Sequence, residues 1–220
     1  MTNPRHPGTG PGRFVVLEGI DGAGTTTQAA MLVSALKRRG RAALGTREPS
    51  DGPIGSMIRQ VLSGRIVGAE GRAPGWATMA LLFAADRMDH VETVVEPFLA
   101  QGGDVVSDRY DASSLAYQSV TSGAGGSGTV EWIRSLNKHA RRPDLTIVVE
   151  VSSEVAADRR KARGEADQIY DQNEVQKALA TFYGMLPEHL PQDRIVLVDG
   201  TGTVDATHAR ILAAYDHAFG

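Results

Sequence analysis

The stretch of sequence that decides the fold is Gly19-Ile20-Asp21-Gly22-Ala23-Gly24-Thr25-Thr26-Thr27. It follows the short apolar run 14–17 and precedes a segment whose apolar residues recur at helical spacing. A short buried strand, a glycine-rich turn and then a helix form the context of a phosphate-binding loop. Gly19 and Gly24 match the pattern G-x-x-x-x-G, and Thr26 stands where that pattern has Ser or Thr. Thr25 stands where the pattern has lysine.

A loop of this kind binds an anion mainly through its backbone. Its glycines allow N–H groups to turn inward around a phosphate, and the following helix adds the partial positive charge of its N-terminus. Thr26 could place its hydroxyl on a magnesium ion, and Asp21 could orient the waters of that metal or contact a substrate phosphate. A glycine-rich turn without a ligand is the alternative, and the density and position of the glycines argue against it.

Length and composition are those of a soluble globular protein. The chain has 220 residues, 41% of them hydrophobic and 22% charged, and it contains no cysteine. It has no apolar run long enough for a membrane span and no apolar signal segment, so we expect a cytoplasmic protein. The net charge of −3 gives no electrostatic reason to expect a nucleic-acid polymer as partner. A small anionic ligand needs only a few local positive groups.

Strands that alternate with helices predict a parallel sheet with helices on both faces. The expected strands are 13–18, 41–46, 104–107, 145–151 and 195–198. The expected helices are 26–39, 54–63, 76–100, 112–120, 129–140, 172–186 and 204–218, with Pro53 opening the second and Pro97 bounding the third near its end, and a charged helix and loop are expected over 153–170. We expect residues 1–12 to form a flexible tail and residues 13–220 to form a single domain.

Asp108 and Arg109 directly follow the predicted strand 104–107. Ligands of open α/β sheets bind beyond the carboxyl ends of such strands. A carboxylate there can order magnesium, and an arginine can hold a phosphate through two hydrogen bonds. An Asp-Arg pair in a turn is more often a surface ion pair, but its position after a buried strand favours a site.

Phe83 and Arg87 lie one turn apart on the predicted helix 76–100 and therefore share a face. A ring that stacks on a base, beside a guanidinium that reads the edge of that base, would make a nucleobase pocket. Considered alone, Phe83 fits a core position and Arg87 a solvated one, so these two residues leave the choice open.

A cluster of arginines begins the segment 159–172, which includes Arg159, Arg160 and Arg163 before Gly164. Concentrated positive charge that ends in a glycine could form a mobile lid that closes over phosphates. A solvated helix face explains the same composition equally well.

In this order and at this spacing, the chain resembles the thymidylate kinase family over about residues 13–215. Beyond the loop, the resemblance rests mainly on the segments Thr46-Arg47-Glu48-Pro49, Leu82-Phe83-Ala84-Ala85-Asp86-Arg87, Asp108-Arg109-Tyr110 and Ser113-Ser114-Leu115-Ala116-Tyr117-Gln118. It implies a three-layer α/β fold of the P-loop nucleoside-monophosphate kinase type, with a five-stranded parallel sheet in a single P-loop kinase domain. It also implies transfer of the γ-phosphoryl group of ATP to dTMP to give dTDP, and a homodimer.

The resemblance further implies a role for each matching residue. The loop residues 19–27 would bind ATP, and Thr26 and Asp108 would serve the Mg2+ ion. The residues that would bind dTMP are Glu48, Phe83, Arg87, Arg109, Ser114, Tyr117 and Gln118. Within this set, Phe83 would stack on thymine, Arg87 would bond the base edge and Tyr117 would lie beneath the deoxyribose. The catalytic residues would be Asp21, Arg109, which also holds the dTMP phosphate, and Arg163 of the lid.

Two positions depart from the family pattern. Thr25 replaces the loop lysine, and residues 167–170 are Asp-Gln-Ile-Tyr where the family often carries Arg and Glu. Losing one preorganised charge of this kind costs on the order of 10²–10³ in rate. Either the chain is a working dTMP kinase in which lid arginines and magnesium supply what Thr25 does not, or it is a non-catalytic or regulatory relative that binds nucleotides. We favour the enzyme, because the residues on the acceptor side are present together.

Overall fold

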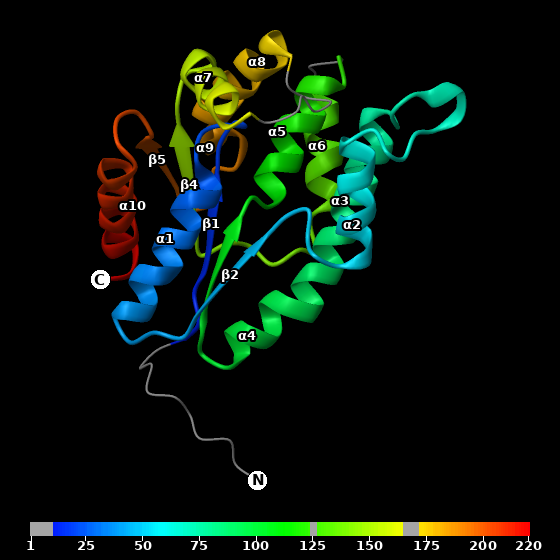
Figure 1. The fold of residues 1–220 in the computed structure, drawn as a ribbon. Helices are drawn as coiled ribbons and strands as arrows, with labels where there is room; N and C mark the ends of the chain where they lie inside the picture. The colour runs from blue at the N-terminus through cyan, green and yellow to red at the C-terminus, as the bar shows by residue number, and fades with distance from the viewer. Residues whose placement is uncertain (1–10, 124–126, 165–171) are drawn as a thin grey trace.

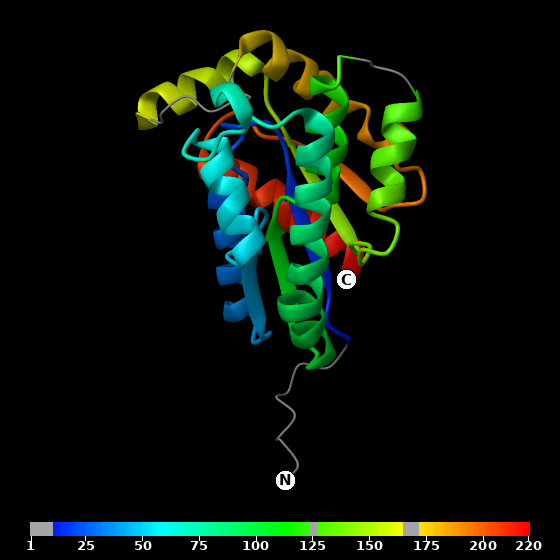
Figure 2. The ribbon, with the colours of Figure 1, turned by 90° about the vertical axis from the view of Figure 1, so that its right-hand side faces the viewer.

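The computed structural model of the chain describes residues 11–123, 127–164 and 172–220. These residues form one five-stranded parallel sheet with helices on both faces, so the predicted α/β fold is confirmed (Figure 1, Figure 2). The strand order across the sheet is β2-β3-β1-β4-β5. The strands are β1 (Phe14–Glu18), β2 (Ala43–Arg47), β3 (Asp104–Asp108), β4 (Leu145–Glu150) and β5 (Ile195–Asp199).

The central strand is β1, which lies between β3 and β4. Its register pairs Leu17 with Asp108 of β3 and with Ile147 of β4. The three inner strands are buried along most of their length, as expected of continuous apolar runs covered on both faces. Because the strand order reverses around β1, the carboxyl ends of β1 and β3 border the crevice in which α/β proteins bind ligands.

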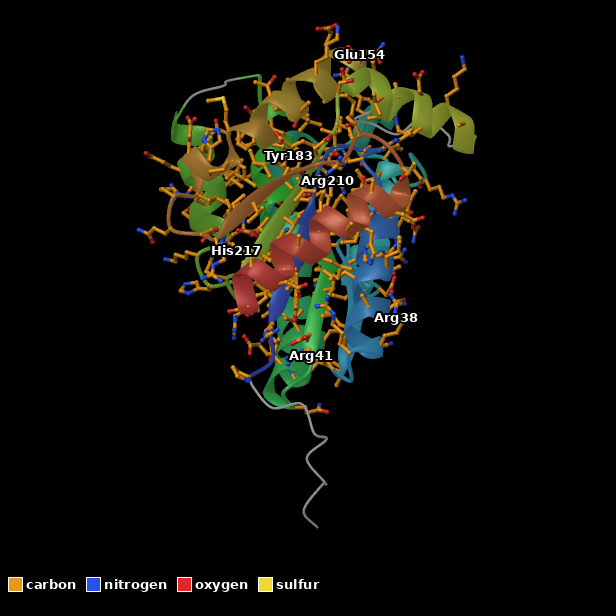
Figure 3. The ribbon with its side chains drawn as sticks, turned by 90° about the vertical axis from the view of Figure 1, so that its left-hand side faces the viewer. Arg38, Arg41, Glu154, Tyr183, Arg210 and His217 are labelled. Atoms are coloured by element: carbon orange, nitrogen blue, oxygen red, sulfur yellow. The ribbon has the colours of Figure 1, made fainter. Side chains whose placement is uncertain are left out.

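Different helices cover the two faces of the sheet. The helices α1 (Thr25–Arg38) and α10 (Val204–Phe219) cover the face seen in Figure 3, where Arg38 and His217 are labelled. The helices α3 (Trp76–His90), α4 (Glu96–Ala100) and α5 (Asp111–Thr121) lie on the other side (Figure 1). α8 (Asn173–Gly184) packs against α5 and β4 near the carboxyl edge of the sheet.

The side chains of β1 alternate between two parts of the core. Val15 and Leu17 belong to the cluster that includes Leu32 of α1. Phe14 and Val16 belong to the cluster that includes Leu99 of α4. This alternation holds β1 between the two helical layers and fixes the position of the loop that follows it.

The predicted helical stretch 76–100 is helical throughout but not uniform. Between α3 and α4 lies the π-helical segment η2 (Val91–Val95), in which the amide of Glu96 donates to the carbonyl of Val91. The wider turn places Pro97 in the first turn of α4, where a missing N–H costs little. Pro97 therefore marks a change of helix type, and the chain stays helical to Ala100.

Helix α2 (Pro53–Leu62) begins at Pro53 as predicted. Helix α6 (Ser127–Leu136) ends before the predicted residue 140, because the Asn137 side chain donates to the carbonyl of Ile133 at 2.8 Å. The remaining helical elements are η1 (Ala69–Gly71), α7 (Ser153–Arg163) and α9 (Leu186–His189). In the described part of the chain, no helix is both long and apolar enough to cross a membrane.

Two predicted segments fall largely or partly outside the described residues. These are the tail 1–12, of which residues 1–10 are not described, and the lid 159–172, of which residues 165–171 are not described. The side chain of Arg163 is also outside the description. The single domain 13–220 and the mobility of the lid stay predictions.

Candidate active site

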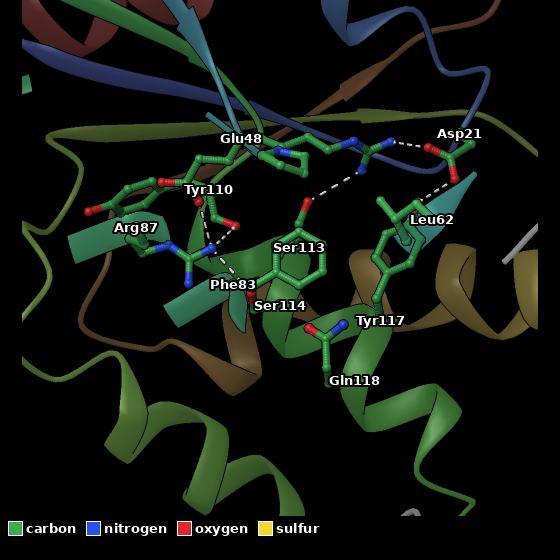
Figure 4. Close-up of a pocket in the computed structure, with 12 residues that line it drawn as sticks. Asp21, Glu48, Leu62, Phe83, Arg87, Tyr110, Ser113, Ser114, Tyr117 and Gln118 are labelled. Carbon is green, nitrogen blue, oxygen red and sulfur yellow. Dashed lines mark hydrogen bonds and ion pairs between the residues drawn. The ribbon is translucent and has the colours of Figure 1, made fainter. Parts of the chain in front are cut away.

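A pocket opens at the carboxyl ends of β1 and β3, and Figure 4 shows the residues that line it. They come from the phosphate loop, the segments after β2 and β3, and the helices α2, α3 and α5. The lining residues are Asp21, Glu48, Pro49, Leu62, Phe83, Arg87, Arg109, Tyr110, Ser113, Ser114, Tyr117 and Gln118. The structure thus brings together, in one pocket, Asp21 and all seven residues named for the acceptor.

Arg109 joins the end of β3 to the phosphate loop. Its Nη1 donates to the carbonyl of Gly19 at 2.6 Å, and its Nη2 pairs with Oδ1 of Asp21 at 2.6 Å. The backbone of Arg109 is left-handed, with φ of 71°, which costs about 1–3 kcal/mol in a residue other than glycine. Burial opposes the charge, but the oxygens of Tyr117 and Asp21 outweigh it, so the pKa of Arg109 is raised. The pocket therefore holds a permanent positive charge at the edge of the loop.

Asp21 faces the pocket from the opposite side of this ion pair. Its Oδ2 accepts a hydrogen bond from the hydroxyl of Tyr117 at 2.9 Å, while Oδ1 binds Arg109 (Figure 4). The guanidinium of Arg109 also lies 5.4 Å from the centroid of the Tyr117 ring. Three side chains from the loop, β3 and α5 are thereby fixed relative to one another.

Arg87 is held at the other end of the pocket by a buried carboxylate. Its Nη2 binds Oε2 of Glu48 at 2.6 Å and Oγ of Ser114 at 3.1 Å, and its Nη1 donates to Oδ1 of Asn137 at 2.5 Å. Burial opposes its charge and Glu48 stabilises it, so that the pKa of Arg87 is raised. Within the described residues its Nε has no partner. Glu48 thus acts on the site through Arg87.

Gln118 is fully buried, and neither its amide oxygen nor its amide nitrogen has a hydrogen-bond partner among the described residues. Phe83 lines the same pocket, and both side chains are labelled in Figure 4. A buried amide that is left unpaired is unfavourable, so its natural partner is a ligand that both donates and accepts. Phe83 and Gln118 together provide a flat apolar surface and a polar edge.

The candidate metal ligands Thr26 and Asp108 lie together at the start of α1 and the end of β3. The Thr26 hydroxyl donates to Oδ2 of Asp108 at 2.5 Å, and Oδ1 of Asp108 is buried without a partner among the described residues. A hydroxyl and a carboxylate are oxygen donors of the kind magnesium prefers, and this ion commonly takes one or two protein ligands beside substrate phosphates. These residues fit a magnesium ion.

The phosphate loop has the backbone that its glycines require. Gly22 has φ of 98°, and a Cβ atom there would lie 2.4 Å from the carbonyl oxygen of Ala156 in α7. Thr25 is the first residue of α1 and is 5% exposed. A Cβ on Gly19 would lie 3.5 Å from the methyl carbon of Thr25, so this side chain faces the opposite end of the loop.

A second cavity adjoins the other side of the loop. It is lined by residues of the loop, α1, α7 and the segment after β5, namely Gly22, Ala23, Gly24, Thr27, Gln28, Arg159, Ala162, Gly202, Val204 and Thr207. Both this cavity and the first pocket are thus lined in part by the phosphate-binding loop. Among the loop residues named for ATP, Gly22, Ala23, Gly24 and Thr27 line this second cavity, and Asp21 lines the first.

Sequence reasoning missed Glu18, the last residue of β1. Its carboxylate is fully buried and accepts hydrogen bonds from the amide of Tyr110 at 2.8 Å, Oγ of Ser113 at 2.6 Å and the Tyr183 hydroxyl at 3.0 Å. Burial raises its pKa to about 7, against the lowering effect of Arg109. The sequence did contain a signal for Glu18, because this acidic residue ends an apolar run directly before the loop.

A parallel sheet with a phosphate loop after its central strand, and an arginine-lined pocket beside that loop, are typical of α/β P-loop proteins that bind nucleotides, a class that includes the P-loop kinases. The family model described as thymidylate kinase matches residues 17–211. A probable thymidylate kinase of Pyrococcus abyssi is 40% identical over 207 residues, which are 94% of this chain and 97% of the relative. A thymidylate kinase of Dinoroseobacter shibae is 37% identical over 209 residues, 93% of this chain and 97% of the relative. The chain belongs to the thymidylate kinase family.

Proposed function

We propose that this chain transfers the γ-phosphoryl group of ATP to dTMP to give dTDP. One observation carries the proposal: a single pocket joins a ring and an unpaired amide, Phe83 and Gln118, to a guanidinium at the phosphate loop, Arg109. A nucleoside monophosphate has a base at one end and a phosphate at the other, so it matches this division. Family membership points to the same acceptor.

The base of dTMP would lie between the ring of Phe83 and the polar group formed by Gln118 and Arg87. The amide of Gln118 can accept from the N–H of thymine and donate to an adjacent carbonyl. The guanidinium of Arg87 is fixed by Glu48 and Ser114, and would offer its Nε to the base edge. Tyr117 would lie beneath the deoxyribose.

The phosphate of dTMP would bind Arg109 and thereby face the γ-phosphate of ATP across the loop. Its oxygen attacks the γ-phosphorus, and the bond to the β-phosphate oxygen breaks. A phosphate monoester is already largely ionised at neutral pH, so this step needs no general base. The protein then has to position the two phosphates and stabilise the charge that develops on them. We assign these tasks to Asp21 and Arg109. The magnesium ion that Thr26 and Asp108 would hold supplies positive charge to the ATP phosphates.

Release of ADP in a coupled assay with Mg-ATP and dTMP tests this function. We expect turnover with dTMP, lower turnover with dCMP and dGMP, and a loss of at least about 100-fold in kcat/KM for Arg109→Ala. Arg38→Ala is a matched control, because it removes an exposed arginine at the far end of α1 (Figure 3).

The threonine at position 25, in place of the loop lysine, favours a second candidate function. The chain would then be a nucleotide-binding relative without catalysis. Calorimetric titration separates the two candidates. Binding of dTMP and ATP without ADP release would establish the second candidate and overturn the first. Failure to bind dTMP would overturn both.

We also propose a homodimer in the cytoplasm. Leu81 and Met88 lie two turns apart on α3, so they share one face of the helix, and they are 52% and 39% exposed. Met57 of the neighbouring helix α2 is 38% exposed. Light scattering on the purified protein should give twice the mass of the chain, and Leu81→Asp should reduce it, whereas Met185→Asp, at an exposed position after α8, should not.

A further inference from the structure

The phosphate loop lacks a lysine, but α7 brings arginine side chains to it. We propose that Arg160 supplies the positive charge that lysine would provide at position 25, and that it binds the phosphates of the nucleoside triphosphate. This assignment deepens the proposed function, on which it rests, because it places Arg160 in the ATP site. It also names a single group where the sequence left several arginines as candidates.

The helix α7 is held directly against the loop. The carbonyl oxygen of Ala156 would lie 2.4 Å from a Cβ on Gly22, so the two backbones touch where only glycine fits. Arg160 follows Ala156 by four residues, and therefore leaves α7 on the same face one turn later. Its position over the loop is thus set by backbone packing and not by the side chain alone.

The guanidinium of Arg160 reaches the loop itself. Its Nη1 donates to the carbonyl oxygen of Asp21, in the middle of the loop. A guanidinium carries five N–H donors in a planar fork, so it can hold a loop carbonyl and a phosphate oxygen together. A loop lysine has the same two tasks, since it must stay near the loop and still meet a phosphate.

Arg159 and Arg109 also contact the loop, and each of them has further partners there. Arg159 lines the second cavity, and both of its terminal nitrogens are engaged: it donates to the carbonyl of Ala23 at 3.2 Å and to that of Gly200 at 2.9 Å, which ties the loop to the segment after β5. Arg109 pairs with the carboxylate of Asp21 and lines the acceptor pocket. Arg160 contacts the central carbonyl of the loop, between these two.

The lysines of the chain cannot take this place. There are four, Lys37, Lys138, Lys161 and Lys177. Lys37 lies in the last turn of α1, the helix whose first residue is Thr25, about 18 Å along its axis at 1.5 Å per residue. Lys177 pairs with Glu174 on α8, Lys138 follows α6, and Lys161 is an exposed neighbour of Arg160.

The test moves the charge from α7 back into the loop. Four proteins are compared: wild type, Arg160→Ala, Thr25→Lys, and Thr25→Lys with Arg160→Ala. We expect Arg160→Ala to lower kcat about 100-fold and ATP affinity at least about tenfold, with dTMP affinity within about twofold of wild type. Thr25→Lys should raise kcat at least tenfold in the Arg160→Ala background and by a clearly smaller factor in wild type, because the two charges perform one task.

Two results overturn the proposal. The first is a kcat and an ATP affinity within twofold of wild type for Arg160→Ala, as expected for the control Arg38→Ala. The second is an equal effect of Thr25→Lys in both backgrounds. If Arg160→Ala does not fold by circular dichroism, Arg160→Gln keeps the length of the side chain without its charge and is judged by the same criteria.

Calorimetric titration with ATP separates this proposal from the proposed function. If wild type binds ATP but does not phosphorylate dTMP, the proposed function fails, and the ATP affinities of the four proteins still decide the role of Arg160. Loss of ATP affinity on Arg160→Ala, with recovery on adding Thr25→Lys, would support it without any turnover. Unchanged ATP affinity would reject it.

Discussion

The side-chain amide of Gln118 is buried in the acceptor pocket with neither of its polar atoms paired among the described residues. Such a group costs about 1–3 kcal/mol until a ligand satisfies it. Glu18 is a second buried polar residue at the same edge of the sheet, and it is satisfied by hydrogen bonds from the start of α5 and from Tyr183. Gln118 thus has polar atoms that a ligand can bind, whereas Glu18 connects parts of the protein around the loop.

Replacing Gln118 with leucine should separate stability from recognition. We expect the free energy of unfolding of the ligand-free protein to rise or stay constant, because an unpaired amide is removed. KM for dTMP should rise at least about tenfold with little change in kcat, because the lost contact is made in both ground and transition states. Thermal melting and steady-state kinetics measure the two effects. A lower Tm with an unchanged KM would show that the amide is structural.

Glu18 should make the stability of the protein depend on pH near neutrality. Burial raises its pKa from 4.5 to about 7, so the folded protein holds this proton more tightly than the unfolded chain does. The resulting stabilisation is complete below pH 4.5 and is lost as the pH rises through about 7. The full loss is roughly 3 kcal/mol.

Urea unfolding of wild type and Glu18→Gln between pH 4.5 and 8.5 checks this expectation. The difference in free energy of unfolding between the two proteins should shift in favour of the glutamine variant as the pH rises. Parallel curves across this range would mean that Glu18 is ionised in the folded protein throughout.

At the scale of elements, the phosphate loop and α7 contact each other backbone to backbone. Gly22 combines φ of 98° with a backbone neighbour at 2.4 Å from the position of a Cβ atom, so the side chain of any other residue would push α7 away. Since α7 carries Arg159 and Arg160, its position also decides which cations reach the loop.

Gly22→Ala should therefore damage ATP binding more than an ordinary left-handed glycine substitution would. The matched control is Gly40→Ala, which has φ of 79° and open space around the added carbon. We expect Gly40→Ala to lose about 1–3 kcal/mol of stability from backbone strain, Gly22→Ala to lose more because the added carbon meets α7, and only Gly22→Ala to weaken ATP binding at least tenfold. Equal ATP affinities for the two variants would show that α7 need not lie against the loop. Calorimetry with ATP makes the comparison.

The order of the elements could be predicted from the sequence. The spacing of apolar residues indicates each helix or strand by itself, and glycines mark many of the boundaries between them. The π-helical turn before Pro97 could not, since helical periodicity does not distinguish a wider turn from a regular one. The acceptor residues were predicted through a family resemblance, and the pocket brings them together. The contacts of Arg160 with the loop and of Asn137 with Arg87 depend on how distant helices pack, and no local pattern encodes that.

On the scale of the whole molecule, the two edges of the sheet have different tasks. The carboxyl edge carries the loop and both cavities. At the amino end of β3, the fully buried Asp104 accepts from Arg41 at 2.6 Å, from the amide of Arg13 at 3.1 Å and from the Tyr215 hydroxyl at 3.1 Å. This carboxylate ties β1, β3, the segment before β2 and α10 together, away from the site.

Asp104→Asn should accordingly weaken the fold without altering the chemistry. Breaking a buried ion pair from one side costs about 3–5 kcal/mol, which should lower Tm by several degrees. KM for dTMP and for ATP should stay within about twofold of wild type at a temperature well below the transition. A changed KM at unchanged stability would show that the two edges are coupled.

The ion pair between Asp21 and Arg109 has one more consequence. The guanidinium that would bind the acceptor phosphate is paired with a carboxylate of the protein itself. We expect a dianionic phosphate to compete with this carboxylate for the guanidinium, which an uncharged group does not do. Thymidine, which has the same base and sugar, carries nothing to exchange for the carboxylate. We therefore expect the ion pair to lower the affinity of this pocket for nucleosides relative to nucleoside monophosphates.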